Sequence, residues 1–408
     1  MFARESHISR KVAWFALPFS SLFGPLLALL FVANVQGQTS TPTPTATPTT
    51  SPTPMTPSLG DVKVTEVYKL GHIDDKNLDT RNSAALQEII VVKVHDLQSL
   101  TRVAKCLNKD DRHVQNCHEQ AIALFLDGRQ IKGIVPESGA PRPEDETLQF
   151  HLQRNADSDE TWADLLGAPT RDAFFKRPTE VAVGLENSYP LPTEVKVKAP
   201  DEMRRFSLIR IHSYWFVICS VLLGAVFVLV VLLAKYSELL RDLGPVPPAD
   251  ANLQANWLQK MKERKHKPYS LARFQMAFWF FLVITSFLFI WLVTGASDTI
   301  TGSTLALIGI GAGTALGAAT VDASKSQNNA EVGAKISNGF LNDILTDDAN
   351  GVSFHRFQMF VWTLVLGILF IYSVWNRLSM PEFTATLLAL MGISSGTYLG
   401  FKIPEKQT

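Results

Sequence analysis

The sequence has no excess of charge of either sign and contains little cysteine. Its 408 residues include 38 Lys and Arg, 38 Asp and Glu and 3 Cys, so the formal net charge at pH 7 is zero. Domains that bind nucleic acid are usually basic over at least one face. The overall charge therefore gives no reason to expect a nucleic-acid partner.

Common catalytic motifs are missing from the polar part of the chain, residues 60–200. This segment contains no G-x-S-x-G, no H-E-x-x-H and no phosphate-binding loop, and its carboxylates stand in turn-like stretches that are typical of a solvated surface. Further along, "GIGAG" does not continue into a dinucleotide fingerprint, because Leu316 occupies the place of the last glycine. We therefore expect no enzymatic activity, no cofactor and no metal site.

Charged residues are also missing from the centres of five apolar runs in the second half of the chain. About 20 apolar residues are enough for a helix to cross a bilayer. Ionisable residues inside such a span usually mark proton or ion pathways, so their absence argues against a coupled transporter. It does not exclude a wide or hydrophobically gated channel. The runs are 214–234, 274–294, 303–320, 357–376 and 383–401.

The N-terminus combines a basic segment with an apolar run and a stretch rich in Thr and Pro. "MFARESHISRK" precedes the apolar run and Gly37 follows it, which predicts a secretory signal peptide over 1–37. The run is long and contains Pro18, so an uncleaved anchor is the alternative. Residues 38–59 are mostly Thr, Ser and Pro, a composition that favours extended chain over a packed core. We expect this segment to be an exported stalk.

Residues 60–200 have the pattern of a folded, β-rich domain. Short β-branched runs alternate with turn residues, and the Asp127-Gly128 pair between two of them is typical of a hairpin. One helix is expected at "SDETWADLLG", ending at Gly167. Six or more short strands predict an all-β, sandwich-like domain, for which an immunoglobulin-like arrangement is one option.

Two of the cysteines stand close together in this domain. Cys106 and Cys117 bracket "LNKDDRHVQN", and in an oxidising compartment such a pair is expected to form a disulfide. The alternative is a metal site that also uses His113 and His118, but the spacing matches no common zinc pattern. Cys219 lies in an apolar run and is expected to be an ordinary buried residue.

The tetrapeptide "RFQM" occurs twice, at 273–276 and at 356–359. With an offset of 83, residues 270–317 align with 353–400 without a gap, and 17 of the 48 positions are identical. Such an internal repeat predicts two copies of one unit, a membrane hairpin of two helices at 273–320 and again at 356–403. Because each copy has an even number of spans, the copies should be parallel.

Each copy places the same kinds of residue at equivalent positions. Ser270 and Ser353 are expected helix N-caps, and Arg273 and Arg356 are expected to anchor the hairpins in the lipid headgroups. The first helix of each hairpin carries large side chains on one face, and the second carries glycines four residues apart, a spacing that allows close helix packing. These residues are Met276, Trp279, Met359 and Trp362, and Gly309, Gly313, Gly317, Gly392, Gly396 and Gly400.

Three explanations of the glycine stripes stay open. The first, which is the most common arrangement, is that the large-residue face of a neighbouring helix fills the glycine groove. The second is that the glycine helices line a symmetric pore. The third is that the stripes form a seam between copies of the chain.

Positive charge gives the expected orientation. Residues 235–273 contain eight Lys or Arg and 321–356 contain three, whereas the turn "GASDTITG" contains none. The positive-inside rule then places 235–272, 321–355 and the C-terminus in the cytoplasm, and 60–200 outside. Arg204, Arg205 and Arg210 disagree with this orientation, because they precede the first span, 212–234, on its outer side.

These features predict a multi-domain membrane protein with an exported β-rich domain, one connecting span and two duplicated hairpins. The function that fits is non-enzymatic: an extracytoplasmic binding or sensing domain on an oligomerising helical anchor in a bacterial cell membrane. The alternative is an oligomeric channel or pore gated through the exported domain. The expected partners are the lipid bilayer, other copies of the chain, and a cell-envelope ligand or protein at residues 60–200.

Overall fold

The computed structural model describes residues 62–72, 78–105, 119–137, 146–193, 206–243, 267–328, 336–347 and 351–404. All of them belong to one compact unit, Pro57–Thr408. The signal segment 1–37, the stalk 38–59 and the Cys106 and Cys117 pair lie outside the described residues and stay predictions. Cys219 is described, and it is buried with a free thiol.

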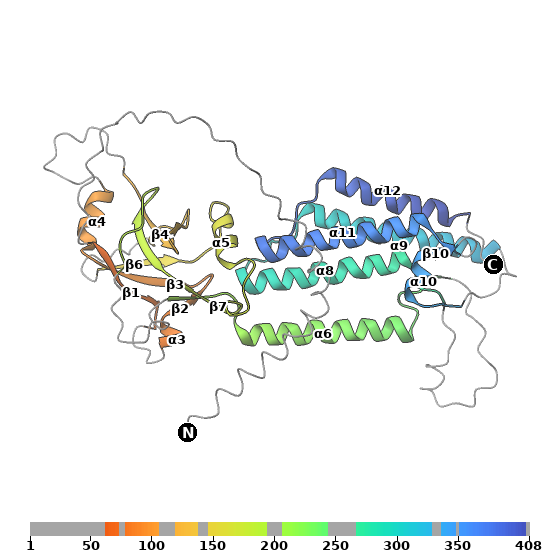
Figure 1. The fold of residues 1–408 in the computed structure, drawn as a ribbon, viewed down its shortest axis with the longest axis horizontal. Helices are drawn as coiled ribbons and strands as arrows, with labels where there is room; N and C mark the ends of the chain where they lie inside the picture. The colour runs from red at the N-terminus through yellow and green to blue at the C-terminus, as the bar shows by residue number, and fades with distance from the viewer. Residues whose placement is uncertain are drawn as a thin grey trace, which may run out of the picture. The chain divides into compact units, whose positions relative to one another are not determined.

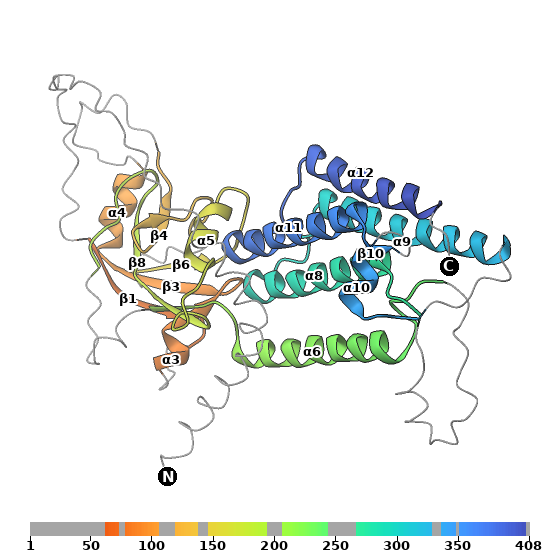
Figure 2. The same cartoon turned by 45° about the vertical axis from the view of Figure 1, so that its right-hand side comes forward.

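Three small sheets are formed by the described part of the β region, residues 62–209 (Figures 1 and 2). The first has the order β1-β3-β6, the second β2-β9-β7 and the third β5-β4-β8; all pairs are antiparallel except β2 with β9. Three short helices lie between strands: α3 (Leu78–Arg81), α4 (Leu97–Ala104) and α5 (Asp159–Leu166). The strands are β1 (Lys63–Lys69), β2 (Ser83–Ala85), β3 (Ile89–His95), β4 (Ile122–Leu126), β5 (Arg129–Gln130), β6 (Thr147–His151), β7 (Lys176–Thr179), β8 (Val181–Leu185) and β9 (Phe206–Ile209).

Two local predictions for the β region are confirmed. Asp127 and Gly128 have φ of 51° and 76° and close a two-residue hairpin in which Leu126 pairs with Arg129. Both central residues of such a tight turn need positive φ, which Asp and Gly tolerate best. Helix α5 begins after Ser158 and ends before Gly167, and its first turn is acidic, which suits the positive end of the helix dipole.

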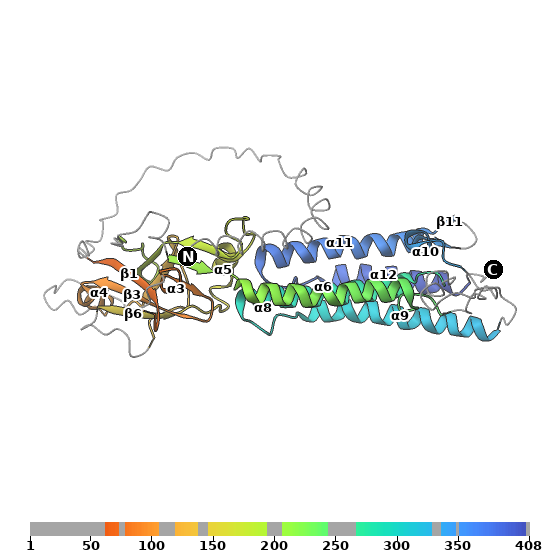
Figure 3. The same cartoon turned by 90° about the horizontal axis from the view of Figure 1, so that it is seen from below.

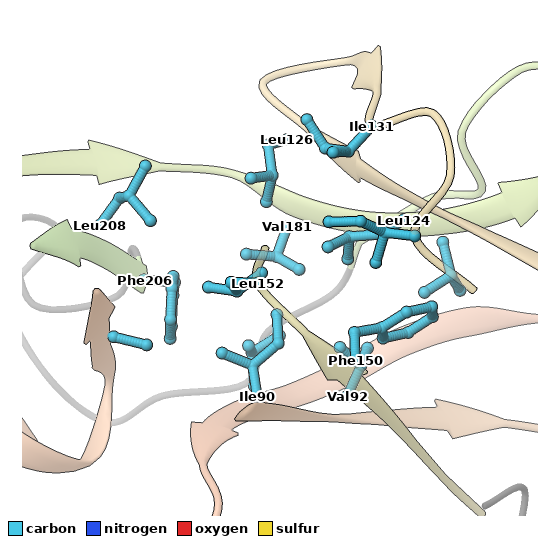
Figure 4. Packing of buried hydrophobic residues seen from close by; sticks show 14 of the residues in the cluster. Ile90, Val92, Leu124, Leu126, Ile131, Phe150, Leu152, Val181, Phe206 and Leu208 are labelled. Carbon is cyan, nitrogen blue, oxygen red and sulfur yellow. The ribbon is translucent and has the colours of Figure 1, made fainter. Parts of the chain in front are cut away.

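The core of the β region is shared by all three sheets. Figure 4 shows side chains of β3, β4, β6, β8 and β9 pointing toward one another, and the labelled residues belong to one buried cluster. The predicted all-β sandwich is not what the structure shows. Instead of two long antiparallel layers, the region has short strands, one parallel pair and helices that add Leu97, Leu100 and Trp162 to the core.

Among the described residues, five long helices follow the β region: α6 (Ser213–Tyr236), α8 (Leu271–Thr294), α9 (Gly302–Asn328), α11 (Phe354–Arg377) and α12 (Ala385–Lys402). The first four are long and apolar enough to cross a membrane. Helix α12 has 18 residues, includes several Ser and Thr, and ends in Lys402, so it is not among these four. A short helix, α10 (Phe340–Leu345), and the hairpin β10 (Thr346–Asp347) with β11 (Gly351–Val352) precede α11.

The helix bounds reproduce the internal repeat. Helix α11 begins and ends 83 residues after α8, and α12 begins 83 residues after α9. Ser270 and Ser353 are the N-caps as expected, although neither side chain makes a capping hydrogen bond. The C-caps are Gly295 and Leu378, which are also equivalent by the repeat, and both have left-handed backbone.

The two hairpins form a ring of four helices, within which α8 packs on α9, α9 on α12, α12 on α11, and α11 on α8 (Figures 1 and 3). Helix α6 contacts α8 but stands largely apart, with 6 % of its apolar stretch buried. In water such an apolar helix would be strongly disfavoured, so its surroundings are expected to be lipid or protein.

Candidate functional site

The large side chains predicted to pack between helices divide into two groups. Trp279 and Met359 are fully buried in the interior of the four-helix ring, and Trp362 is half-buried against the same interior. Met276 is 42 % exposed. Equivalent positions of the repeat therefore have different surroundings, because the two copies contact each other through different faces.

The glycine stripes are not filled by helices of the same chain. A methyl group added at Gly309, Gly313, Gly392, Gly396 or Gly400 would meet no atom within 4 Å among the described residues. Gly317 alone of the six is in close contact, at 2.8 Å from the Leu399 side chain. Among the described residues, no neighbouring helix therefore fills the groove beside these five glycines. Packing against another helix, a seam between copies and a pore all stay predictions.

Arg273 and Arg356 bind protein atoms at the start of each hairpin. The guanidinium of Arg273 donates to the carbonyl oxygens of Glu238 and Leu239 at 3.3 and 3.4 Å. Arg356 is only 5 % exposed, and its guanidinium lies 5.7 Å from the centre of the Tyr398 ring. Neighbouring helices enclose Arg356, and the headgroup role stays a prediction for both arginines.

A buried ion cluster joins three segments at the same ends of the helices. Lys402, at the end of α12, contacts Asp322 of α9 at 2.9 Å and Asp242, after α6, at 3.1 Å. Lys402 and Asp322 are 3 % and 4 % exposed. A buried ion pair seldom adds much net stability, but losing one partner leaves a costly unpaired charge. This charge clamp, defined as Lys402, Asp322 and Asp242, therefore fixes the relative positions of α9, α12 and the segment after α6.

At the opposite ends of the helices, the β region binds the end of α11. The guanidinium of Arg154 donates to the carbonyl oxygens of Leu378 and Arg377 at 2.8 and 3.0 Å and pairs with Asp159. The last carbonyls of a helix have no partner within the helix, and a cation there also interacts favourably with the helix dipole. Arg154 is thus a C-terminal cap supplied by the β region.

Leu378 is held in an unfavourable backbone conformation at this contact. Its φ is 51°, a left-handed geometry that costs a non-glycine residue about 1–2 kcal/mol. Its side chain is 1 % exposed and belongs to the core of the β region, as does Val293 near the end of α8. Burial and the Arg154 hydrogen bonds together offset the backbone cost, so the strained turn depends on the β region being in place.

A second contact brings backbone against backbone. The amide of Ala168 donates to the carbonyl oxygen of Trp375 at 3.0 Å. A Cβ at Gly167 would lie 2.2 Å from the carbonyl oxygen of Asn376, so only glycine allows this approach. At α8, a Cβ on Gly295 would lie 3.1 Å from the Gln87 side chain. The ends of both α8 and α11 therefore contact the β region.

The third element of this contact is an aromatic cage around Arg210, between β9 and α6. Its guanidinium lies 5.5 Å from the centre of Phe174, 5.2 Å from Phe289 of α8 and 5.7 Å from Trp375 of α11. Phe289 and Trp375 stack on each other at 5.9 Å. One side chain thus connects the β region, the start of α6 and the ends of two further helices.

The charge of Arg210 is poorly compensated. The side chain is 2 % exposed, and Nε, Nη1 and Nη2 have no hydrogen-bond partner among the residues that the structure describes. Desolvation by burial lowers the pKa of Arg210 to about 10. Cation–π contacts with desolvated rings contribute roughly 2 kcal/mol or more, which reduces the cost of this burial without a counter-ion. The contacts of Arg154, Gly167, Ala168 and Arg210 with the helix ends are called the junction below.

Sequence reasoning missed most of the junction, although one signal pointed to it. Arg210 is a positive charge on the side of the first span where the charge bias expects few, and the structure gives it an aromatic cage. Nothing in the local pattern marked Arg154. Among the described residues, no group of three or more His, Cys, Asp and Glu is arranged to hold a metal ion.

Comparisons with known proteins add no relative to this picture. No protein-family model, no curated protein and no solved structure matches the chain. The junction and the four-helix ring therefore have to be interpreted from their own chemistry.

Proposed function

We propose that this chain is a non-enzymatic integral membrane protein whose β region, outside the cell membrane, binds or senses a ligand and passes the effect to the membrane helices. The observation that carries the proposal is the junction. The β region supplies the cap of α11 through Arg154, buries Leu378 in its own core and surrounds Arg210 jointly with α8 and α11.

The chemistry of the junction suits signal transmission better than passive anchoring. A tether needs only a covalent linker, whereas here a strained Leu378 turn and a nearly uncompensated Arg210 charge both depend on the β region. Strained backbone and unpaired buried groups are typical of switch regions. A ligand that shifted the β region would change the free energy of both features. It would thereby change which conformation the ends of α8 and α11 favour.

The placement in the membrane is part of the proposal. The β region contacts the C-terminal ends of α8 and α11, while the C-terminal end of α6 and the charge clamp lie at the other ends of the helices. With the positive-inside rule, this arrangement supports a cytoplasmic C-terminus and an extracytoplasmic β region. For the β region itself, a sandwich-like pairing of its small sheets around one core stays a proposal.

We also propose that copies of the chain associate through α9 and α12. Five glycines on these helices have open space beside them within the chain, and glycines four apart allow another helix backbone to approach closely in lipid. If the contacting helices surrounded a central space, the assembly would be a channel gated through the junction, which is the second candidate function. Native mass spectrometry from mild detergent would count the copies, and a monomer throughout would contradict both ideas.

The proposed placement can be tested with single cysteines. In a background in which Cys106, Cys117 and Cys219 are all replaced by alanine, Lys132→Cys in the β region should react with an impermeant thiol reagent on intact cells. Lys265→Cys and Lys335→Cys should react only after the cells are opened. Labelling of either position on intact cells, or protection of Lys132→Cys, would overturn the extracytoplasmic binding domain and with it the proposed function.

A further inference from the structure

Four buried polar atoms inside the four-helix ring have no hydrogen-bond partner among the described residues. They are Oε1 of Gln275, Nε1 of Trp279, Oγ of Ser395 and Oη of Tyr398. Gln275, Trp279 and Tyr398 are 0 % exposed and Ser395 is 4 % exposed. Polar atoms in a protein interior are almost always paired with protein or with a bound molecule, so four unpaired atoms in one part of the ring need an explanation.

Helix geometry places the four side chains close to one level of the ring. Gln275 and Trp279 are about one turn apart on α8, and Ser395 and Tyr398 are about one turn apart on α12. Helix α11 packs against both and links them. Gln275 donates from Nε2 to Oγ1 of Thr363 at 3.1 Å, and Met359, one turn before Thr363, shares a buried cluster with Tyr398.

Small residues of α9 lie beside these atoms. Ala315 and Ala318 of α9 belong to the cluster that contains Tyr398, and Gly311 of α9 approaches Trp279, with an ideal Cβ 3.6 Å from its Cδ1 atom. The buried polar side chains of α8 and α12 therefore lie against a stretch of α9 whose own side chains are small.

The polar level is enclosed on both sides. Toward the junction, the rings of Trp279 and Phe370 lie 6.4 Å apart within an apolar cluster that includes Leu366 and Met391. Toward the other ends of the helices, the charge clamp on Lys402 and the guanidinium of Arg356 adjoin Tyr398, at 5.9 and 5.7 Å from its ring centre. The neutral polar level thus lies between an apolar layer on the junction side and a charged layer on the other side.

The four atoms define the chemistry of what they bind. Trp279 Nε1 only donates, Gln275 Oε1 only accepts, and the hydroxyls of Ser395 and Tyr398 can do both. None of the four groups is charged, so they offer a bound molecule hydrogen bonds but no counter-charge, which suits an uncharged occupant. We infer that this level of the ring is a buried polar site, formed by Gln275, Trp279, Ser395 and Tyr398, which holds a small uncharged molecule that donates and accepts hydrogen bonds, either water or a solute such as urea.

Hydroxyl-radical footprinting of the full chain in nanodiscs tests the site. Radicals generated from bound water oxidise adjacent side chains even where bulk solvent has no access. Trp162 is the matched control, because it is equally buried but its Nε1 donates to the carbonyl oxygen of Gln153 at 3.1 Å. We expect Trp279 and Tyr398 to be oxidised several-fold faster than Trp162. Burial alone would give all three side chains similarly slow oxidation.

Added urea at a non-denaturing concentration distinguishes the two occupants. Unchanged oxidation of Trp279 would identify water, and a selective fall at Trp279 and Tyr398 would identify exchange with an uncharged solute; both results support the site. The double variant Gln275→Leu, Ser395→Ala should reduce oxidation of Trp279, whereas Ser394→Ala, whose hydroxyl accepts from Gln358, should not. Oxidation of wild-type Trp279 and Tyr398 no faster than Trp162 overturns the inference, whether or not the variants fold.

Discussion

Gly167→Val should destabilise the protein by about 3 kcal/mol, at the upper end of the range for overpacked sites. An ideal Cβ at this position would lie 2.2 Å from the carbonyl oxygen of Asn376 and 2.4 Å from that of Ala163. Both obstacles are backbone atoms, which cannot move aside as the tip of a flexible side chain can. The valine therefore has to push α5 away from the end of α11. Denaturant unfolding of the full chain in nanodiscs, followed by tryptophan fluorescence, would measure the loss.

Gly302→Val is the matched control for this substitution. Gly302 begins α9, and a Cβ there would meet nothing within 4 Å among the described residues. We expect a change of at most about 0.5 kcal/mol, as for surface substitutions in general. Equal effects of Gly167→Val and Gly302→Val would show that the close approach of α5 and α11 does not exist in the membrane-embedded protein.

Arg210→Met should leave the protein at least as stable as the wild type, and Arg210→Ala should destabilise it strongly. Replacing a buried charge with an apolar side chain of similar length is often neutral, or stabilising by about 1–4 kcal/mol. Alanine would instead leave a cavity among Phe174, Phe289 and Trp375, and truncating a long buried side chain costs about 2–5 kcal/mol. The two variants should therefore differ clearly in denaturant midpoint. A methionine variant as unstable as the alanine variant would mean that the charge itself holds the junction together.

The contribution of Arg210 to the free energy of unfolding should change with pH in a defined direction. Because burial lowers its pKa in the folded protein to about 10, the unfolded chain binds more protons than the folded one above that pH. Stability contributed by this residue then rises as the pH increases from about 10 toward the ordinary arginine value. The Arg210→Met variant should lack this rise, which separates the contribution of Arg210 from that of other groups that titrate in alkali.

The helices could be predicted because their signals are local. The apolar runs, the caps Ser270 and Ser353, the Asp127-Gly128 hairpin and the end of α5 at Gly167 all follow from residues near one another in the sequence. The repeat is visible because two stretches of the sequence are directly similar at an offset of 83. A sandwich is not shown by the structure, and the sequence could not decide the point because strand patterns do not determine which strands pair. The β region instead forms three short sheets around one core.

The junction could not be predicted, since its contacts join distant parts of the chain. Arg154 reaches the carbonyl oxygen of Leu378 across 224 positions of sequence. A glycine pattern likewise shows where a backbone can approach but does not name its partner. Five of the six stripe glycines have no described atom within 4 Å of an added Cβ, while Gly167, expected only to end a helix, makes a close approach to α11.

Hydrogen–deuterium exchange on a variant with a destabilised β region tests most directly whether a change in the β region alters the membrane helices. Leu124→Ala removes a fully buried side chain from the shared core of the three sheets and should cost about 2–5 kcal/mol. In nanodiscs, we predict faster exchange in the β region and also in 290–295 and 374–378, where α8 and α11 meet it. Exchange in 271–275 and 354–358, at the other ends of the same helices, should not change. Faster exchange confined to the β region, with 374–378 as protected as in the wild type, would contradict coupling through the junction.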